Sequence, residues 1–389
     1  MKNQQNKEDL EAFLPIARPA TGPEEIEAVK KVLESGWLTQ GPFVAEFERA
    51  FASRHSVKHA FAVTSCTSAL HLALVVLGIG PGDEVLVPAF TWVATSNVVV
   101  HCGARPVFVD IDPGTFNVDP DAVRAALTER TKALIAVHLF GRIAPMDELR
   151  AILPEGMPIV EDAACAIGAS FRGQPAGSLG QIGCFSLHPR KVVTCGEGGV
   201  VTTNDDKLAG LIDTYRNHGA SVSEEIRHRG ARPWELPAFK VFGFNYRMTD
   251  IQAAIAEVQL RKLDRFIEER RQLADHYDAR LQSIEWISAP ERPDHAGHSL
   301  QAYVATIDPQ RAPVSRNRAL EILQAKKIGA RPGTHAVVAL EAYRREFGVD
   351  PQRFPGAMAA EAQSIALPLH NEMDFADVDR VVEALEKAE

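Results

Sequence analysis

Short, continuously apolar runs alternate with helix-like segments between about residues 59 and 204. Runs that are apolar throughout predict strands covered on both faces, as in a mainly parallel sheet flanked by helices. Segment 68–77 is apolar nearly all round and predicts a buried helix, and 119–126 predicts another after an Asp-Pro start. The expected strands are 59–64, 84–88, 106–111, 133–140, 158–161, 182–187 and 199–203. This alternation predicts an α/β layer architecture.

The pattern changes near residue 249. Thr249 and Gln252 have capping-box spacing, and apolar residues then recur at helical spacing, so one long helix is expected to connect the sheet to the remainder. Beyond it, a strand at 300–307 and helices at 318–326 and 375–387 predict a smaller α/β unit. At roughly 150 residues per domain, the chain length also favours two domains. We expect a large domain over 1–250, including an N-terminal segment, and a small C-terminal domain over 251–389.

The charge balance argues against nucleic acid as a partner. The chain has 42 basic and 51 acidic residues, a net charge of −9, whereas nucleic-acid binding needs a basic surface. An anionic small molecule stays possible, because helix termini and a few arginines can dominate a pocket.

Targeting and redox features favour a cytoplasmic protein without a membrane span. Residues 1–12 hold no apolar run typical of a secretory signal, and stretch 69–77 is far shorter than the roughly 20 residues that a bilayer helix needs. The five cysteines lack Cys-x-x-Cys spacing, which fits a reducing compartment. His295 and His298 are interpreted as part of a solvated loop, so no metal site is expected.

Two standard phosphate motifs can be set aside. The glycines of 78–82 lack dinucleotide spacing and follow a helix instead of a strand, and no Gly-Lys-Ser/Thr sequence exists for a P-loop. Nicotinamide and nucleoside triphosphate chemistry therefore lose their main support.

Candidate chemistry gathers at the expected carboxyl ends of strands, where open α/β sheets bind ligands. Asp162 follows the run 158–161, and Lys191 follows 182–187 beside a glycine turn at 196–199. A partly desolvated lysine is a nucleophile toward carbonyls, and a carboxylate can hold a pyridine nitrogen protonated. These two groups are the minimum for a pyridoxal phosphate site. A lysine in a solvated turn and an aspartate capping a helix remain the alternative.

Several separated motifs resemble one family. The segment 159–204 contains Glu-Asp-Ala-Ala, Gly-Ser-Leu-Gly, Ser-x-His-x-x-Lys and Glu-Gly-Gly, and further matches lie at 35–41, 80–85, 91–95, 107–112, 245–250 and 367–369. In this order they resemble the DegT/DnrJ/EryC1/StrS sugar aminotransferases across nearly the whole chain. The resemblance implies a type I pyridoxal phosphate fold and a homodimer with active sites at the subunit interface.

The same resemblance implies roles around the cofactor ring. Lys191 is expected to carry pyridoxal phosphate as a Schiff base and to shuttle the proton of the substrate carbon. Asp162 is expected to face the pyridine nitrogen and keep it protonated, and Trp92 to stack on the ring. Without the resemblance, Trp92 would be interpreted as a core aromatic at a strand end.

The cofactor phosphate needs hydrogen-bond donors. Residues 64–68 end a strand and open the apolar helix, so backbone N–H groups of Cys66 and Thr67 are candidates, with the Ser186 hydroxyl beside them. By similarity, Asn245 of a partner subunit is expected to reach the same phosphate. Without that similarity, Ser65 or Thr67 is simply a helix N-cap.

Two cysteines depart from the family pattern. Cys66 stands where relatives often have glycine, which leaves a backbone donor in place. Cys165 stands where many relatives have glutamine or histidine beside the phenolic oxygen of the cofactor, and a thiol is a weak donor. Around the substrate, His188, Arg247 and His335 are the candidates. The segment 331–335 could approach a nucleotide sugar, although a structural turn explains its Pro-Gly equally well.

These expectations give a function. L-glutamate is expected to donate its amino group to a nucleotide-linked keto-sugar, a 4-keto-6-deoxyhexose, in two half-reactions with ping-pong kinetics. The alternatives are a pyridoxal phosphate-dependent sugar dehydratase, an aminotransferase acting on a keto-cyclitol, and a non-catalytic protein that keeps the fold. The presence of Lys191, which related dehydratases can replace by histidine, favours transamination.

Overall fold

The computed structural model describes residues 13–220, 234, 238–292 and 297–388. A seven-stranded sheet lies at the centre of its larger α/β part. Its strand order is β1-β10-β9-β6-β5-β2-β4, and β10 alone runs antiparallel to its neighbours. The strands are β1 (His59–Val63), β2 (Glu84–Pro88), β4 (Arg105–Val109), β5 (Thr131–Val137), β6 (Ile159–Asp162), β9 (Ile182–Ser186) and β10 (Gly199–Thr203). The predicted α/β fold class is confirmed.

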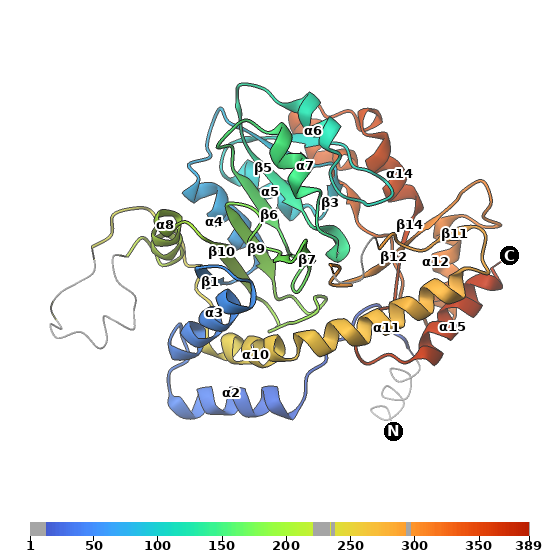
Figure 1. Cartoon of the computed structure of the whole chain (residues 1–389), viewed down its shortest axis with the longest axis horizontal. Coiled ribbons are helices and arrows are strands. Elements are labelled where there is room, and N and C mark those ends of the chain that lie inside the picture. The colour runs from blue at the N-terminus through green and yellow to red at the C-terminus, as the bar shows by residue number, and fades with distance from the viewer. Residues whose placement is uncertain (1–12, 221–233, 235–237, 293–296, 389) are drawn as a thin grey trace.

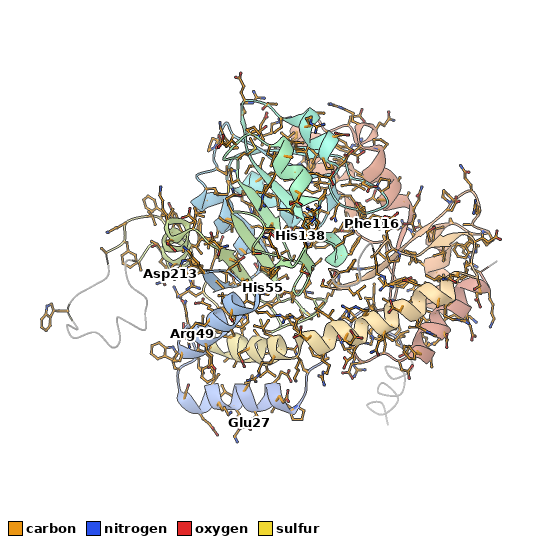
Figure 2. All side chains as sticks on the ribbon, viewed as in Figure 1. Glu27, Arg49, His55, Phe116, His138 and Asp213 are labelled. Atoms are coloured by element: carbon orange, nitrogen blue, oxygen red, sulfur yellow. The ribbon has the colours of Figure 1, made fainter. Side chains whose placement is uncertain are left out.

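Helices cover both faces of this sheet (Figure 1). Helices α4, α5 and α8 pack on one face. Helix α3 packs on the other face against β1, and α10 (Asp250–Arg261) packs on α3. Side chains fill the space between the layers (Figure 2). Strands β2, β9 and β10 are buried at every residue, which explains why they are apolar without alternation. The helices of these layers are α2 (Pro23–Ser35), α3 (Pro42–Arg54), α4 (Cys66–Val76), α5 (Ala94–His101), α6 (Pro120–Ala126), α7 (Met146–Ile152) and α8 (Asp206–Arg216).

The single long helix expected after Thr249 is instead two helices. Thr249 caps α10 (Asp250–Arg261) through the predicted capping box with Gln252, but the helix ends at Lys262 and α11 (Leu263–Leu281) begins anew. The two run end to end beneath the sheet in Figure 1. Helix α10 packs on α2 and α3, whereas α11 packs on α15 (Phe375–Glu386), so the break lets each half follow a different layer.

A second, three-stranded antiparallel sheet lies at the far end of α11. It consists of β11 (Ile287–Ser288), β12 (Tyr303–Ile307) and β14 (Ser364–Leu367), covered by α11, α12 (Arg316–Ala325) and α15 (Phe375–Glu386). The strand expected at 300–307 starts three residues later, because Leu300 has a positive φ of 52°. Shorter elements complete the structure: β3 (Phe90–Thr91), η1 (Leu139–Gly141), β7 (Ser170–Phe171), β8 (Gln174–Pro175), β13 (His335–Ala336), η2 (Val337–Ala339), α13 (Glu341–Phe347), η3 (Pro351–Arg353) and α14 (Pro355–Gln363).

The two halves of the chain share a core. Strand β13 pairs antiparallel with β3, and Ala336, Val337 and Val338 lie in the same apolar cluster as α4 and β2. Residues after position 250 therefore also pack on the large sheet. The division at residue 250 stays a prediction.

Two observations concern absent features. None of the helices in the described part of the chain combines the length and apolar character that a bilayer crossing needs. Across the described ranges, no group of three or more His, Cys, Asp or Glu residues could hold a metal ion. His295 lies outside the described residues, and the expectation that His298 is solvated is wrong: it is buried, and its Nδ1 accepts the Leu300 N–H at 2.9 Å.

Candidate active site

The Asp162 carboxylate lies at the carboxyl end of β6 and is 5% exposed. Its Oδ2 accepts the Thr95 hydroxyl at 2.8 Å, and its Oδ1 accepts the Ala164 N–H at 3.2 Å. The Cys66 thiol lies 3.9 Å from Oδ1. Burial raises the pKa of the Asp162 carboxyl, and the Thr95 and Ala164 hydrogen bonds and the Lys191 charge offset this only in part. A buried carboxylate held by neutral donors favours a cationic ligand.

Lys191 follows β9, the strand next to β6 in the sheet. Its backbone N–H donates to the His188 carbonyl at 2.8 Å, which forms a tight turn, and its half-buried side chain brings Nζ to 3.2 Å from the Cys165 Sγ atom. The structure thus brings Asp162, Cys165 and Lys191 to the carboxyl ends of two adjacent parallel strands, where such sheets bind ligands.

Helix α4 supplies a turn suited to a phosphate. Ser65 is its N-cap and accepts the Ser68 N–H at 3.1 Å, and the first intrahelical bond runs from the Ala69 N–H to the Ser65 carbonyl. The N–H groups of Cys66 and Thr67 therefore precede the intrahelical ladder and point outward at the positive end of the helix.

Gly199 lets this turn lie against β10. A Cβ atom at Gly199 would be 2.5 Å from the carbonyl group of Ser65 and 2.7 Å from the backbone nitrogen of Cys66. Ser186, the last residue of β9, is buried and accepts the His188 N–H at 3.4 Å. Burial raises the pKa of the Cys66 thiol well above its usual range, so Cys66 offers a neutral side chain and a backbone donor.

Trp92 and His335 come together from distant parts of the chain. Trp92 is 57% exposed, and its ring centroid lies 5.7 Å from that of His335, because β13 pairs with β3. The interpretation of Trp92 as a core aromatic is wrong. In the described part of the chain, Trp92 therefore presents an exposed ring face on which a planar ligand could pack.

Asn245 and Arg247 lie on an extended segment next to the start of α4. Arg247 pairs with Val63 in an isolated bridge, and its Nη1 donates to the Asn217 Oδ1 at 2.8 Å. Asn245 is exposed. The contribution of Asn245 from a partner subunit stays a prediction.

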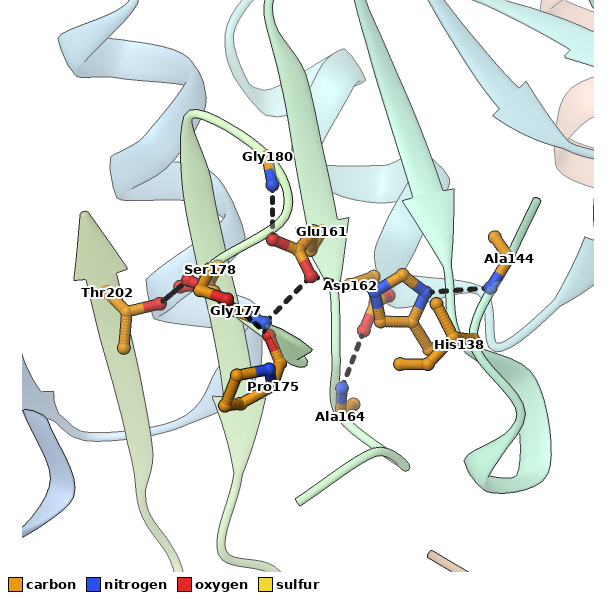
Figure 3. A network of polar contacts seen from close by, with 12 residues as sticks. His138, Ala144, Glu161, Asp162, Ala164, Pro175, Gly177, Ser178, Gly180 and Thr202 are labelled. Carbon is orange, nitrogen blue, oxygen red and sulfur yellow. Dashed lines mark hydrogen bonds and ion pairs between the residues drawn. The ribbon is translucent and has the colours of Figure 1, made fainter. Parts of the chain in front are cut away.

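A buried network behind Asp162 escaped the sequence interpretation (Figure 3). Glu161 and Asp162 point to opposite sides of β6, as successive strand residues do. Glu161 accepts the N–H groups of Gly177 and Gly180, and Oε2 lies 2.9 Å from Nε2 of His138. Because Nδ1 of His138 accepts the Ala144 N–H, Nε2 carries the proton and donates it to Glu161. The network therefore joins β6 to the residue that follows β5 and to the turn that precedes β9.

The missed residues left different signals. Glu161 was visible only as an acid ending an apolar run, and Thr95 only as a residue of the 91–95 motif. Neither signal indicates the partner: Glu161 bonds residues 16 to 23 positions away, and Thr95 bonds Asp162, which is 67 positions away.

The described residues fit pyridoxal phosphate. The ring nitrogen needs a buried acid such as Asp162, the phosphate needs a helix start, the aldehyde needs an amine, and the ring needs a flat apolar contact. At the start of α4, Gly199 lies so close to the backbone of Ser65 and Cys66 that a Cβ atom would not fit there.

Comparisons with known proteins agree with this geometry. The model of the DegT/DnrJ/EryC1/StrS aminotransferase family matches residues 19–386. The Bacillus subtilis (strain 168) spore coat polysaccharide biosynthesis protein SpsC is 38% identical over 379 residues, which cover 96% of each chain.

Solved structures of similar proteins share the fold. The Streptococcus pneumoniae protein Spr1654 in its PMP-form has a TM-score of 0.90 at 29% identity, with 96% of this chain and 98% of that chain covered. Its PLP-form has a TM-score of 0.87 at 30% identity, with 97% and 100% covered. DesI, solved in the presence of its TDP-sugar product, has a TM-score of 0.86 at 31% identity, with 96% and 92% covered.

Proposed function

Because the chain belongs to the DegT/DnrJ/EryC1/StrS aminotransferase family and is a pyridoxal phosphate-dependent sugar aminotransferase, we propose that L-glutamate is its amino donor and a nucleotide-linked keto-sugar its acceptor. The keto-sugar is a 4-keto-6-deoxyhexose. The observation that carries the proposal is the placement of Asp162 and Lys191 at the ends of adjacent parallel strands, with the amine half-buried.

Each described residue has a proposed task at the cofactor. When bound, pyridoxal phosphate supplies an electron sink that lets a proton leave the substrate carbon. Asp162 keeps the ring nitrogen protonated, and Trp92 covers the ring. The N–H groups of Cys66 and Thr67, the Ser186 hydroxyl and, from a partner subunit, Asn245 hold the phosphate. Cys165 contacts the amine of Lys191.

Lys191 performs the proton transfers in this proposal. In the donor half-reaction, its Nζ takes the proton from the α-carbon of L-glutamate. Water supplies the keto oxygen of 2-oxoglutarate, which leaves, and the amino group stays on the enzyme. In the acceptor half-reaction, the amino group passes to the sugar ketone, the ketone oxygen leaves as water, and Nζ delivers a proton to the former ketone carbon. The separation of the two half-reactions gives ping-pong kinetics.

The acceptor region combines aromatic and basic groups. His188, Arg247 and His335 are proposed to contact the sugar nucleotide. Burial lowers the pKa of His188, opposed by Glu197, and the cations of Lys191, Arg190 and Arg331 lower it further, so His188 is neutral at pH 7. The TDP-sugar product named for DesI and the polysaccharide pathway named for SpsC support a sugar acceptor.

A homodimer with shared sites is proposed as the working form. Phe239 and Phe242 are exposed aromatic residues on the segment that carries Asn245 and Arg247. A second copy of the chain would cover them, since exposed aromatic patches of this kind mark protein interfaces. Light scattering of the purified protein tests the dimer.

A mass-spectrometric screen tests the function. Keto-sugar nucleotides are incubated with L-glutamate and the holoenzyme, and amino-sugar and 2-oxoglutarate are quantified together. We expect equal amounts of both with a 4-keto-6-deoxy acceptor. Water loss without matching 2-oxoglutarate would indicate a dehydratase, and amination of a keto-cyclitol would change the acceptor class.

Lys191→Ala is expected to abolish the visible absorbance of the lysine-bound cofactor and the amine transfer. Lys207→Ala, on the exposed face of α8, is the matched control. A Lys191→Ala enzyme that keeps the absorbance and still consumes both substrates would overturn the proposal.

A further inference from the structure

The thiol of Cys165 and the amine of Lys191 are in direct contact. Their Sγ and Nζ atoms lie 3.2 Å apart, with Nζ donating to the sulfur, and both side chains are partly exposed. Both groups are nucleophiles, so they do not react with each other as they stand. An oxidant that makes the sulfur electrophilic changes this, because a sulfenic acid condenses with a neighbouring nitrogen. The pair is therefore a candidate site of oxidative modification.

Backbone contacts hold the two side chains beside each other. The Cys165 carbonyl accepts the Ser299 hydroxyl at 2.8 Å, which ties this turn to the segment before β12. The Lys191 N–H donates to the His188 carbonyl at 2.8 Å. Neither contact uses Sγ or Nζ, so the two reactive atoms stay available to each other. Groups held in contact react as if they were present at very high concentration.

The other four cysteines lack such a pairing. All five are free thiols, and Cys66, Cys184 and Cys195 are buried. The sulfur atoms of Cys66 and Cys195 contact oxygen atoms instead of an amine. Cys102 is half-buried at the end of α5, and burial raises its pKa to about 11. Because peroxide reacts with the thiolate, we expect Cys165 to be oxidised first.

We propose that hydrogen peroxide joins Sγ of Cys165 to Nζ of Lys191 in a reversible sulfenamide. Peroxide first oxidises the thiol to a sulfenic acid, and one molecule of water leaves. The ammonium loses a proton to solvent, and the neutral Nζ attacks Sγ. The sulfenic hydroxyl then leaves with a second amine proton as water. In total, thiol, amine and peroxide give the S–N bond and two molecules of water, and the pair passes two electrons to the peroxide.

Thiols reverse the modification. One thiol attacks Sγ and releases the amine, and a second thiol restores the Cys165 thiol and leaves with the first as a disulfide. The sulfenamide also protects Cys165 from further oxidation to a sulfinic acid, which thiols do not reduce.

The modification would inactivate the site, because it uses the nitrogen to which we assign the cofactor and the proton transfers. This consequence rests on the proposed function, whereas formation of the bond does not. A cofactor joined to Lys191 occupies the same nitrogen. The bond is therefore expected only when the amine is released, in cofactor-free enzyme or between the two half-reactions.

Peptide mapping of the full chain tests the bond. Cofactor-free enzyme is treated with hydrogen peroxide and digested with trypsin. We expect peptide 151–172 to be joined to peptide 191–207 with the loss of two hydrogen atoms, since trypsin does not cut after a modified lysine. Fragmentation distinguishes a link at Lys191 from one at Cys195 in the same peptide. Dithiothreitol should restore the separate peptides and the capacity to bind pyridoxal phosphate.

Substitutions separate the bond from general oxidation. Lys191→Ala should leave Cys165 as a sulfenic acid, trapped by dimedone, and as a sulfinic acid, each several-fold above wild type. Cys165→Ser should form no link, and peroxide should leave its own capacity to bind pyridoxal phosphate unchanged. Cys102→Ser is the matched control, because Cys102 is also half-buried, and it should form the link as wild type does.

The holoenzyme gives the same comparison without a substitution. Cofactor on Lys191 should suppress the link several-fold, and L-glutamate, which frees the amine in the proposed donor half-reaction, should restore it. Sulfinic acid at Cys165 without a link, or a link from Cys165 to another cysteine, would overturn the proposal. A link that forms in cofactor-free enzyme but not in holoenzyme with L-glutamate would support the bond and count against L-glutamate as the donor.

Discussion

The Nζ atom of Lys191 lies 3.2 Å from the Sγ atom of Cys165, which places a thiol against the amine proposed to do the chemistry. Because of this contact, the thiol of Cys165 can serve as a chemical probe of the site. A ligand covalently joined to Lys191 would occupy the space beside the thiol, so the accessibility of Cys165 reports on the state of the lysine.

We predict that an alkylating reagent at pH 8 modifies Cys165 before the other cysteines in the cofactor-free enzyme. Burial raises the pKa of Cys102 to about 11 and that of Cys195 to about 12. It also raises the pKa values of Cys66 and Cys184 well above their usual range, so the reactive thiolates of all four are scarce. Peptide mass mapping over time measures the order. Loading with pyridoxal phosphate should slow the reaction several-fold, and equal rates at Cys102 and Cys165 would contradict the prediction.

Asp162→Asn should stabilise the cofactor-free protein while weakening cofactor retention. The folded pKa of Asp162 is raised by burial, so its favourable contribution is present at low pH and is lost as pH rises through the folded pKa. At pH 7 the ionised group opposes folding, so its removal should raise the free energy of unfolding. Denaturant unfolding and dialysis measure the two effects.

Thr95→Val is the opposing control for Asp162→Asn. It removes the hydroxyl donor that stabilises the carboxylate at 2.8 Å, so it should destabilise the cofactor-free protein at pH 7. Two variants that shift stability in the same direction would argue against a buried negative charge at Asp162.

Glu161→Gln should destabilise the protein by about 1–3 kcal/mol. Its carboxylate accepts three N–H donors, from Gly177, Gly180 and His138, and an amide cannot accept at both of its terminal atoms. Guanidinium unfolding measures the loss. The control is Glu148→Gln on the exposed face of α7, which should change stability by less than about 0.5 kcal/mol. Equal effects of the two substitutions would show that the network contributes little.

Gly199→Ala should displace the start of α4 and weaken cofactor binding. The added Cβ atom would lie 2.5 Å from the Ser65 carbonyl group, which is backbone and cannot move independently of the helix. We expect loss of affinity for pyridoxal phosphate by at least about tenfold, measured by absorbance after gel filtration. Gly210→Ala, within α8 and with open space around it, should be neutral or stabilising by up to about 1 kcal/mol. Normal cofactor binding by Gly199→Ala would place the phosphate elsewhere.

Acid should destabilise the fold partly through His55. Its ring stacks on Phe51 with centroids 4.1 Å apart, and its Nε2 is buried without a partner in the described structure. Burial lowers its pKa from 6.5 to about 4, so the unfolded chain binds a proton that the folded chain excludes, and stability falls as pH falls from 6.5 toward 4.

At pH 4, His55 is expected to lower the free energy of unfolding by about 3 kcal/mol. His55→Phe should flatten the dependence of stability on pH over that range, and His101→Phe, at an exposed position on α5, should not. An unchanged slope in His55→Phe would assign the acid sensitivity to other groups, such as His370, whose pKa burial lowers to about 4.

Local pattern was enough to predict the central sheet. Strands β2 and β10 match their expected bounds, because an apolar run bounded by turn residues has one stable place in a layered fold. The strand expected at 133–140 ends at Val137, because Phe140 adopts a positive φ of 57° that an apolar pattern cannot reveal.

Contacts between distant residues set the limit of sequence interpretation. Asp162 and Lys191 were found because each follows a strand, and strand ends meet at one edge of a parallel sheet. Thr95 reaches the same edge from α5, and no spacing along the chain encodes that approach.

The pairing of β13 with β3 has a consequence for how such enzymes can diversify. Because Ala336 and its neighbours are buried against the large sheet, a hybrid made by joining the first 250 residues of one relative to the remainder of another would juxtapose unmatched apolar surfaces. Exchanging one complete half of the chain for that of a relative is therefore a poor route to a new acceptor preference. Single substitutions at exposed positions around Trp92 and His335 would alter the proposed acceptor surface and leave the shared interior intact.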